Sequence, residues 1–312
     1  MMASAPVWGD LAPAVIRPAI LARKRKVDHP DSSWLVLPMR NEAYRQFELM
    51  WPGGYFEGEP RDPLGQNTYG VWGFHSAIFT IYMACIRPYV SANTTVLEIG
   101  PGRGAWSKAI LDRGAAHLYA VDAATAEHTR FWEHVGGRSK ATYLVATDCS
   151  LTGVPDNSID FFFSFGCFCH LPPEMSAAYI QALSTKMKPG AQGFFQFGDF
   201  NKYTRMLEEG ADKFSLLRII RQKRRKVWLP TRLAYELSWR FFRSRMDIAP
   251  VSTERCANLT DAHGRGSWHH WSTADACTTL QASGFSVVES DIGILARDPI
   301  VHFRKPSLSD VR

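Results

Sequence analysis

The sequence contains little cysteine and no long apolar run, and both features exclude classes of protein. Six cysteines among 312 residues are too scattered for a small disulfide-stabilised domain, so reduced thiols are expected. Cys167, Cys169 and His170 lie close together, but the second ligand pair of a structural zinc site is missing, and no metal is expected. The longest apolar run, Phe161 to Phe168, is far shorter than the roughly 20 residues that cross a bilayer.

The N-terminal residues also lack the apolar stretch of a secretory signal. Asp10 and Pro13 interrupt this region, and its basic cluster, Arg23 to Lys26, comes late. Together with the missing apolar run, this pattern predicts a cytoplasmic protein.

Positive charge is concentrated in one segment of the chain. The net charge is +6, yet residues 201–250 contain thirteen lysines and arginines against five acidic residues, a net charge of +8. The rest of the chain is therefore slightly acidic, with a net charge of −2. The basic character belongs to this segment and not to the protein as a whole.

From about residue 94, short apolar runs alternate with helical stretches, which is typical of a parallel sheet covered on both faces. Five strands are expected at 96–99, 118–121, 143–147, 161–165 and 194–197, and the helices between them at 106–113, 124–135 and from 172 or 173 to before Pro189. Ser272 and Asp275 form a capping box that predicts another helix. Two final runs, 285–288 and 300–303, are too close for a crossover helix and predict an antiparallel hairpin.

The expected fold is therefore α/β, a doubly wound seven-stranded sheet of five parallel strands and a C-terminal antiparallel hairpin. It carries a helical insertion and an N-terminal extension. The predicted segments are a partly helical extension at 1–90, an α/β core at 91–200, a basic helical insertion at 201–267 and the completion of the core at 268–312.

The residues that indicate function follow the first strands of this sheet. Glu98 is followed by Gly100, Gly102 and Gly104, a glycine-rich turn at the sheet edge where open α/β folds bind ligands. Asp122 follows the second strand, where a carboxylate can accept hydrogen bonds from both ribose hydroxyls, and Asp148 follows the third. Each acid could instead be a helix N-cap.

A nicotinamide dinucleotide site uses similar residues but different spacing. Its fingerprint is G-x-G-x-x-G with a pyrophosphate at the helix N-terminus. Here the third glycine comes one residue early, and Glu98 precedes the first glycine, where it would repel a pyrophosphate. This arrangement favours a ligand that has an ammonium group and no phosphate.

These motifs resemble the class I S-adenosylmethionine-dependent methyltransferase family over about residues 75–200 and 268–306. The resemblance implies S-adenosylmethionine as cofactor and S-adenosylhomocysteine as product. It also implies that the donor is bound by Glu98, Gly100, Pro101, Gly102, Gly104, Asp122, Ala123, Asp148, Cys149 and Phe165.

The possible classes of methyl acceptor are fewer because the sequence lacks two motifs that members of this family use. Amino-group methylation of bases uses Asn/Asp-Pro-Pro-aromatic after the fourth strand, where this chain has Ser164 to Cys167. Cytosine C5 methylation needs a cysteine beside proline, which is also missing here, and we interpret the cysteines as packing residues. The remaining expectation is a hydroxyl of a small molecule, such as a sugar, glycan precursor or secondary metabolite.

A hydroxyl acceptor has to lose its proton, and histidine is a suitable base. His170, directly after the fourth strand, is the first candidate, although loop packing explains it equally. Asp199, at the end of the fifth strand, and His269 or His270 are further candidates. Asp199 with Asp148 could hold a divalent ion, but no clear ligand set accompanies them.

The basic insertion is compatible with several kinds of binding partner. It begins at the edge of the sheet where acceptors are expected to bind, so it could form a lid over an anionic acceptor. Its charge is equally consistent with peripheral membrane contact through 213–246 or with a solvated helix face. An RNA-directed methyltransferase is the alternative function, although no RNA-binding module is recognisable. A third hypothesis is a non-catalytic subunit that binds partners through the insertion.

Overall fold

The computed structural model describes residues 56–63, 74–205, 268–295 and 297–307, all within one compact unit, Ser33–Arg312. Most of the predicted insertion and of the N-terminal extension lies outside the described residues. None of the described helices is long and apolar enough to span a membrane.

The described residues form the expected seven-stranded sheet, and its strand order is β3-β2-β1-β4-β5-β7-β6. The first five strands are mutually parallel, β7 pairs antiparallel with β5, and β6 pairs antiparallel with β7 at the edge. The strands are β1 (Thr95–Ile99), β2 (His117–Asp122), β3 (Ala141–Val145), β4 (Ile159–Ser164), β5 (Met187–Gln196), β6 (Ser286–Glu289) and β7 (Ile300–Arg304).

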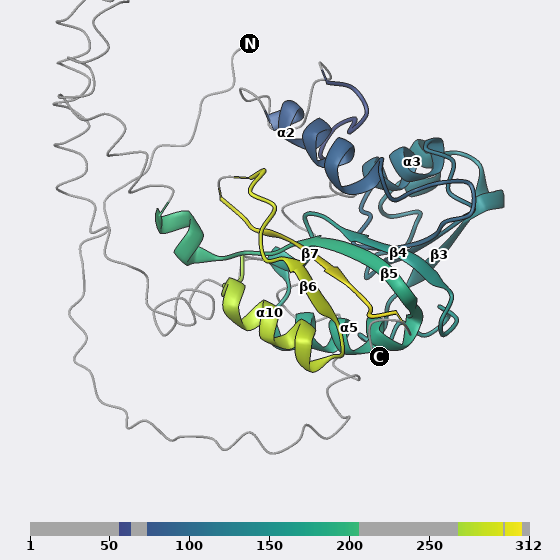
Figure 1. The fold of residues 1–312 in the computed structure, drawn as a ribbon. Coiled ribbons are helices and arrows are strands. Elements are labelled where there is room, and N and C mark those ends of the chain that lie inside the picture. Colours follow the sequence, from purple (N-terminus) through teal and green to yellow (C-terminus); the bar gives the residue numbers. More distant parts are fainter. Residues whose placement is uncertain (1–55, 64–73, 206–267, 296, 308–312) are drawn as a thin grey trace, which may run out of the picture. The chain divides into compact units, whose positions relative to one another are not determined.

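Helices cover both faces of the sheet, and each face has its own apolar core (Figure 1). On one face lie α5 (Pro173–Lys186) and α10 (Thr273–Ala282). The other face carries α2 (Phe74–Ile81), the π-helix η2 (Tyr82–Ile86), α3 (Ala105–Asp112) and α4 (Phe131–Val135). Because both faces are covered, the central strands are rich in buried apolar residues: Phe161, Phe162 and Phe163 of β4 are at most 1% exposed. Two short 3-10 turns, η3 (Arg138–Lys140) and η4 (Phe168–His170), complete the described elements.

Local sequence signals explain where several of these elements begin. The side chain of Ser272 accepts a hydrogen bond from the backbone N–H of Asp275 at 3.1 Å, which confirms the predicted cap of α10. Proline at the first position of α5 is compatible with a helix start, because that backbone N–H has no partner inside the helix.

Three predicted elements are wrong in their extent. The fifth strand, expected at 194–197, already begins at Met187 and ends at Gln196. The helix expected at 124–135 forms only at Phe131–Val135, because Thr125 accepts a hydrogen bond from the backbone N–H of His128 at 3.2 Å and holds a turn. The third strand ends at Val145, not near residue 147. Asp148 therefore lies in the loop beyond the strand, where its carboxylate accepts a hydrogen bond from the N–H of Ser150 at 2.8 Å.

Candidate active site

The glycine-rich turn connects β1 to α3 and accommodates no side chain at two of its positions. Gly100 has a φ of 74°, and a Cβ built there would lie 2.4 Å from the Cβ of Cys167. Gly104 has a φ of 93°, and its Cβ would lie 2.3 Å from Val135. Glycine is required here both by the backbone conformation and by the close approach of the loop after β4 and of α4.

Asp122, the last residue of β2, is joined to this turn. Its Oδ2 accepts a hydrogen bond from the N–H of Gly102 at 3.1 Å, and its Oδ1 accepts one from Ala124 at 2.9 Å. Each carboxylate oxygen has two lone pairs, so both can still accept a bond from a ribose hydroxyl. Burial raises the pKa of Asp122, while the backbone hydrogen bonds oppose that shift.

Glu98 lies beneath the same turn and is only 2% exposed. Its Oε2 accepts a hydrogen bond from the hydroxyl of Ser107 in the first turns of α3. Burial raises the pKa of Glu98 from 4.5 to about 8, the bond from Ser107 lowers it, and the nearby Asp122 carboxylate raises it further. The predicted donor acids Glu98 and Asp122 are therefore neighbours at the sheet edge.

The other predicted donor residues differ in their surroundings. Cys149 is completely buried in the core, and burial raises its thiol pKa to about 12, in agreement with a packing role. Phe165 is 6% exposed and packs on Trp106 with ring centroids 5.2 Å apart. A donor contact of Phe165 would thus involve its backbone. Pro101 is buried within the glycine turn, and Ala123, which follows Asp122, is half-buried.

Two of the predicted catalytic residues, His170 and His269, are placed near each other by backbone hydrogen bonds to the loop after β4. His170 ends η4 directly after the loop that packs on Gly100, and its N–H donates to the carbonyl of Cys167 at 2.8 Å. The N–H of His269 donates to the carbonyl of Cys169 at 2.7 Å. The segment that leads back into the core is therefore fastened to the loop after β4.

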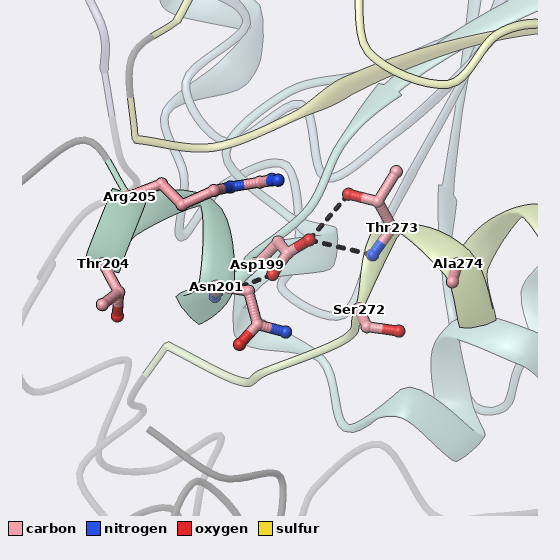
Figure 2. Close-up of a pocket in the computed structure, with 7 residues that line it drawn as sticks. All are labelled: Asp199, Asn201, Thr204, Arg205, Ser272, Thr273 and Ala274. Carbon is pink, nitrogen blue, oxygen red and sulfur yellow. Dashed lines mark hydrogen bonds between the residues drawn. The ribbon is translucent and has the colours of Figure 1, made fainter. Parts of the chain in front are cut away.

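Asp199 has a structural function in this arrangement (Figure 2). One carboxylate oxygen accepts hydrogen bonds from the N–H and hydroxyl of Thr273 at 2.9 and 2.7 Å, and the other accepts one from the N–H of Asn201 at 2.9 Å. Burial raises the pKa of Asp199, but these bonds lower it below its ordinary value. Asp199 thus connects the end of the central sheet to the start of α10, beside a pocket of about 430 Å³.

The neighbouring His270 is buried and neutral. Its Nδ1 accepts a hydrogen bond from the N–H of Phe200 at 3.1 Å, so the ring proton is on Nε2. Burial lowers its pKa, although the Asp199 carboxylate 4.0 Å away opposes that shift. Among the described residues no group of three or more potential ligands could hold a metal ion.

One buried acid at this edge was not predicted from the sequence. Asp298 is 1% exposed, and its Oδ2 accepts hydrogen bonds from Gln196 at 2.6 Å and from both Nε and Nη2 of Arg297 at 2.9 and 2.6 Å. Its Oδ1 is buried and has no partner within the described part of the chain. Gln196 in turn accepts the N–H of Gly166 at 2.8 Å, which links Asp298 to the loop after β4.

Asp298 also lies beside η4, at the acceptor side of the sheet. Burial raises the pKa of the Cys169 thiol, and the nearby Asp298 carboxylate raises it further. Burial raises the pKa of Asp298 itself, whereas Arg297 and Gln196 lower it. In the sequence Asp298 is an ordinary acid before the last strand, and only its burial and free oxygen distinguish it.

Comparisons with known proteins show a matching family and several solved structures of similar fold. Residues 97–195 match the family model described as "Methyltransferase domain". No curated protein sequence matches the chain. Solved structures of similar fold include an S-adenosylmethionine-dependent methyltransferase from Mesorhizobium loti, with 15% identity, coverage of 70% of this chain and 95% of the other, and a TM-score of 0.46.

Two further solved structures resemble the chain. A methyltransferase from Aquifex aeolicus is 17% identical, covers 70% of this chain and 85% of its own, and has a TM-score of 0.40. A 1,6-didemethyltoxoflavin-N1-methyltransferase from Burkholderia thailandensis is 13% identical. The match covers 74% of this chain and 76% of the other, with a TM-score of 0.41.

The family match confirms the predicted class of protein. Over residues 97–195 the α/β core matches a methyltransferase domain, and S-adenosylmethionine stays the predicted methyl donor. Asp122 at the end of β2 fits that donor, because both of its carboxylate oxygens retain a lone pair for the ribose hydroxyls. The roles of the individual site residues stay predictions.

Proposed function

We propose that the protein transfers a methyl group from S-adenosylmethionine to a hydroxyl of a small molecule. The donor supplies an activated methyl group, so the protein has to align the acceptor, exclude water and accept one proton. The observation that carries the proposal is the carboxylate of Asp298, since one of its oxygens is fixed by three N–H donors and the other is free within the described residues.

Asp298 suits the proton-accepting role better than the other candidates. Asp199 uses its oxygens to bind Thr273 and Asn201, and its pKa is lowered, which makes it a weak base. The pKa of Asp298 is raised by burial, which brings a carboxylate closer to the range in which it accepts a proton at neutral pH. His170 stays a second candidate because it ends the loop after β4.

The substrate class is tested with an isotope-labelled methyl donor. A metabolite extract and a total RNA sample are each incubated with the protein and the labelled donor, and products are analysed by mass spectrometry. We expect one labelled methyl group on a hydroxyl of a small molecule. Label on nitrogen or carbon, or label only in RNA, would contradict the proposal.

The proton acceptor is then tested on the product so identified. Asp298→Asn keeps the size of the side chain and removes the charge, and we expect methyl transfer to fall about 100-fold or more with unchanged S-adenosylhomocysteine affinity. Asp291→Asn is the matched control, because Asp291 lies in the same hairpin loop and pairs with Lys202 at 2.6 Å. Equal activity of both variants would exclude Asp298 as the base.

A further inference from the structure

The pocket beside Asp199 lies between the helical turn 200–205, which follows β5, and the start of α10 (Figure 2). Its volume is about 430 Å³, and it is lined by Asp199, Asn201, Thr204, Arg205, Ser272, Thr273 and Ala274. Every lining residue except Ala274 has a polar side chain, and none is aromatic. The ligand of such a pocket is recognised by hydrogen bonds, so the free donors and acceptors decide its chemistry.

Asp199 is the one acid among these lining residues, and its hydrogen-bonding capacity is used up. Oδ2 accepts two bonds from Thr273, and Oδ1 accepts the N–H of Asn201 at 2.9 Å and the N–H of Lys202 at 3.4 Å. Since each carboxylate oxygen has two lone pairs, these four donors occupy all of them. The charge of Asp199 is therefore compensated at short range, and Asp199 offers no acceptor to a ligand.

Two hydrogen-bond donors of the pocket have no partner among the described residues. The N–H of Ala274 is at the second position of α10, where the helix itself supplies no acceptor, whereas the N–H groups on either side of it are already bonded. The hydroxyl of Thr204 is likewise unpartnered, although this residue is only 8% exposed. Leaving a buried hydroxyl without a partner is costly, and a ligand in the pocket would supply the missing acceptor.

Arg205 adds a positive charge to these donors. It is exposed, forms no ion pair with the described residues, and extends from its helical turn toward the start of α10 (Figure 2). A guanidinium group and the N-terminus of a helix both favour the oxygens of a carboxylate or phosphate. The free groups of the pocket therefore match an anion that is rich in acceptors.

We propose that this pocket binds a carboxylate or phosphate group of the methyl acceptor, so that the acceptor is a small anionic molecule. This inference rests on the proposed function and names the class of its acceptor. Lys202, on the same helical turn as Arg205, donates to the carbonyl of Asp298 at 3.1 Å. One turn of helix thus connects the pocket with the residue proposed as the proton acceptor.

The first test asks whether the pocket binds anions. Thermal denaturation of the full chain is measured with inorganic phosphate, with acetate and with sodium chloride, all at equal ionic strength. Phosphate and acetate separate recognition of a phosphate from recognition of a carboxylate. The variants are Arg205→Gln, Thr204→Val and Thr204→Ser. Arg87→Gln is the matched control, because Arg87 is an exposed arginine at the end of η2, on the opposite face of the sheet from α10.

We expect phosphate, acetate or both to raise the melting temperature of the native chain and of Arg87→Gln above the chloride value, because a ligand that binds only the folded state stabilises it. This rise should be at least halved in Arg205→Gln and reduced in Thr204→Val, while Thr204→Ser, which keeps the hydroxyl, should retain it. No rise above chloride in the native chain, or an equal rise in Arg205→Gln, would overturn the inference.

The second test concerns the acceptor itself. The labelled product from the metabolite extract is passed over an anion exchanger at neutral pH, where we expect it to be retained. Arg205→Gln should then raise the KM for that acceptor, with kcat and S-adenosylhomocysteine affinity little changed. A neutral product with label on a hydroxyl would overturn the inference and leave the proposed function intact. A retained product with label on nitrogen or carbon would contradict the proposed function and support the anion pocket.

Discussion

At the scale of single residues, the carboxylates near the sheet edge differ in how many of their lone pairs the protein uses. Asp199 binds both groups of Thr273 and the backbone of Asn201, which makes it part of the framework. Asp122 accepts one backbone bond on each oxygen and keeps capacity for a ligand. The same residue type therefore serves structure in one position and donor binding in the other.

Replacing Asp122 tests this assignment. Asp122→Ala should weaken S-adenosylhomocysteine binding by about 1–3 kcal/mol, because ribose hydroxyls lose their acceptors. Asp122→Asn should bind with intermediate affinity, since its single carbonyl oxygen replaces one of the two acceptors. Calorimetry measures both values, and an affinity for Asp122→Ala equal to that of the native chain would mean that the ribose lies elsewhere.

Glu98 makes the stability of the ligand-free protein dependent on pH. Its pKa is 4.5 in its ordinary state and about 8 in the folded chain, so between these values the folded state holds a proton that the unfolded state has lost. The free energy of unfolding therefore decreases as pH rises from about 4.5 to 8, by an amount on the order of a few kcal/mol.

Thermal denaturation between pH 5 and 8.5 measures this effect. The melting temperature of the native chain should decrease with rising pH more than that of Glu98→Gln, which has nothing to ionise at this position. Gln can still accept the hydrogen bond from Ser107. Parallel pH profiles of the two proteins would show that Glu98 has an ordinary pKa.

At the scale of elements, the glycine turn is held by close packing against the loop after β4. Gly100→Ala would place a Cβ 2.4 Å from the Cβ of Cys167. The matched control is Gly114→Ala: Gly114 also has a positive φ, of 102°, but nothing lies within 4 Å of its Cβ position. Both variants share the backbone cost, so only the first adds a steric clash.

Urea denaturation should therefore show a larger loss of stability for Gly100→Ala than for Gly114→Ala, by about 1–3 kcal/mol. Adding Cys167→Gly to Gly100→Ala should restore part of that difference, because it removes the side chain that clashes. A double-mutant cycle measures the coupling. Equal stability of the two alanine variants would show that the loops do not pack as described.

The elements that the sequence predicts best are those with strong local signals. The turn from Glu98 to Gly104, the Ser272 cap and the C-terminal hairpin all depend on residue type and spacing, and the structure contains them. The end of β3 and the short α4 were predicted less well, because hydrogen bonds of Thr125 and Asp148 locally replace helix and strand.

Glu57 and Asp298 were missed for a different reason. Neither belongs to a sequence motif, and each becomes notable only through burial next to residues far away in the chain. Glu57 is 3% exposed although it lies outside the α/β core, and Asp298 binds Gln196, a partner 102 positions away. Such burial depends on the folded arrangement of the sheet, which a single sequence does not specify at this level.

At the scale of the whole molecule, charge is divided between the segment 201–250 at +8 and a remainder that is slightly acidic. Little of that segment lies within the described residues, yet its first helical turn is fastened to the core. Lys202 binds the carboxylate of Asp291 at 2.6 Å and the carbonyl of Asp298 at 3.1 Å. The insertion is therefore joined to the residue that we propose as the proton acceptor.

Reversing the charge of the densest basic cluster distinguishes the partners of this segment. In one variant glutamate replaces Arg221, Lys223, Arg224, Arg225 and Lys226. If the segment contacts an anionic small acceptor, the KM for that acceptor should increase, while S-adenosylhomocysteine affinity stays unchanged because the donor residues lie in the core. RNA binding, measured by electrophoretic mobility at two salt concentrations, should be weak and strongly salt-dependent in both proteins, as for non-specific phosphate contacts. Salt-resistant RNA binding that the variant abolishes, with unchanged kinetics on the small acceptor, would contradict the small-molecule proposal and favour an RNA-directed methyltransferase.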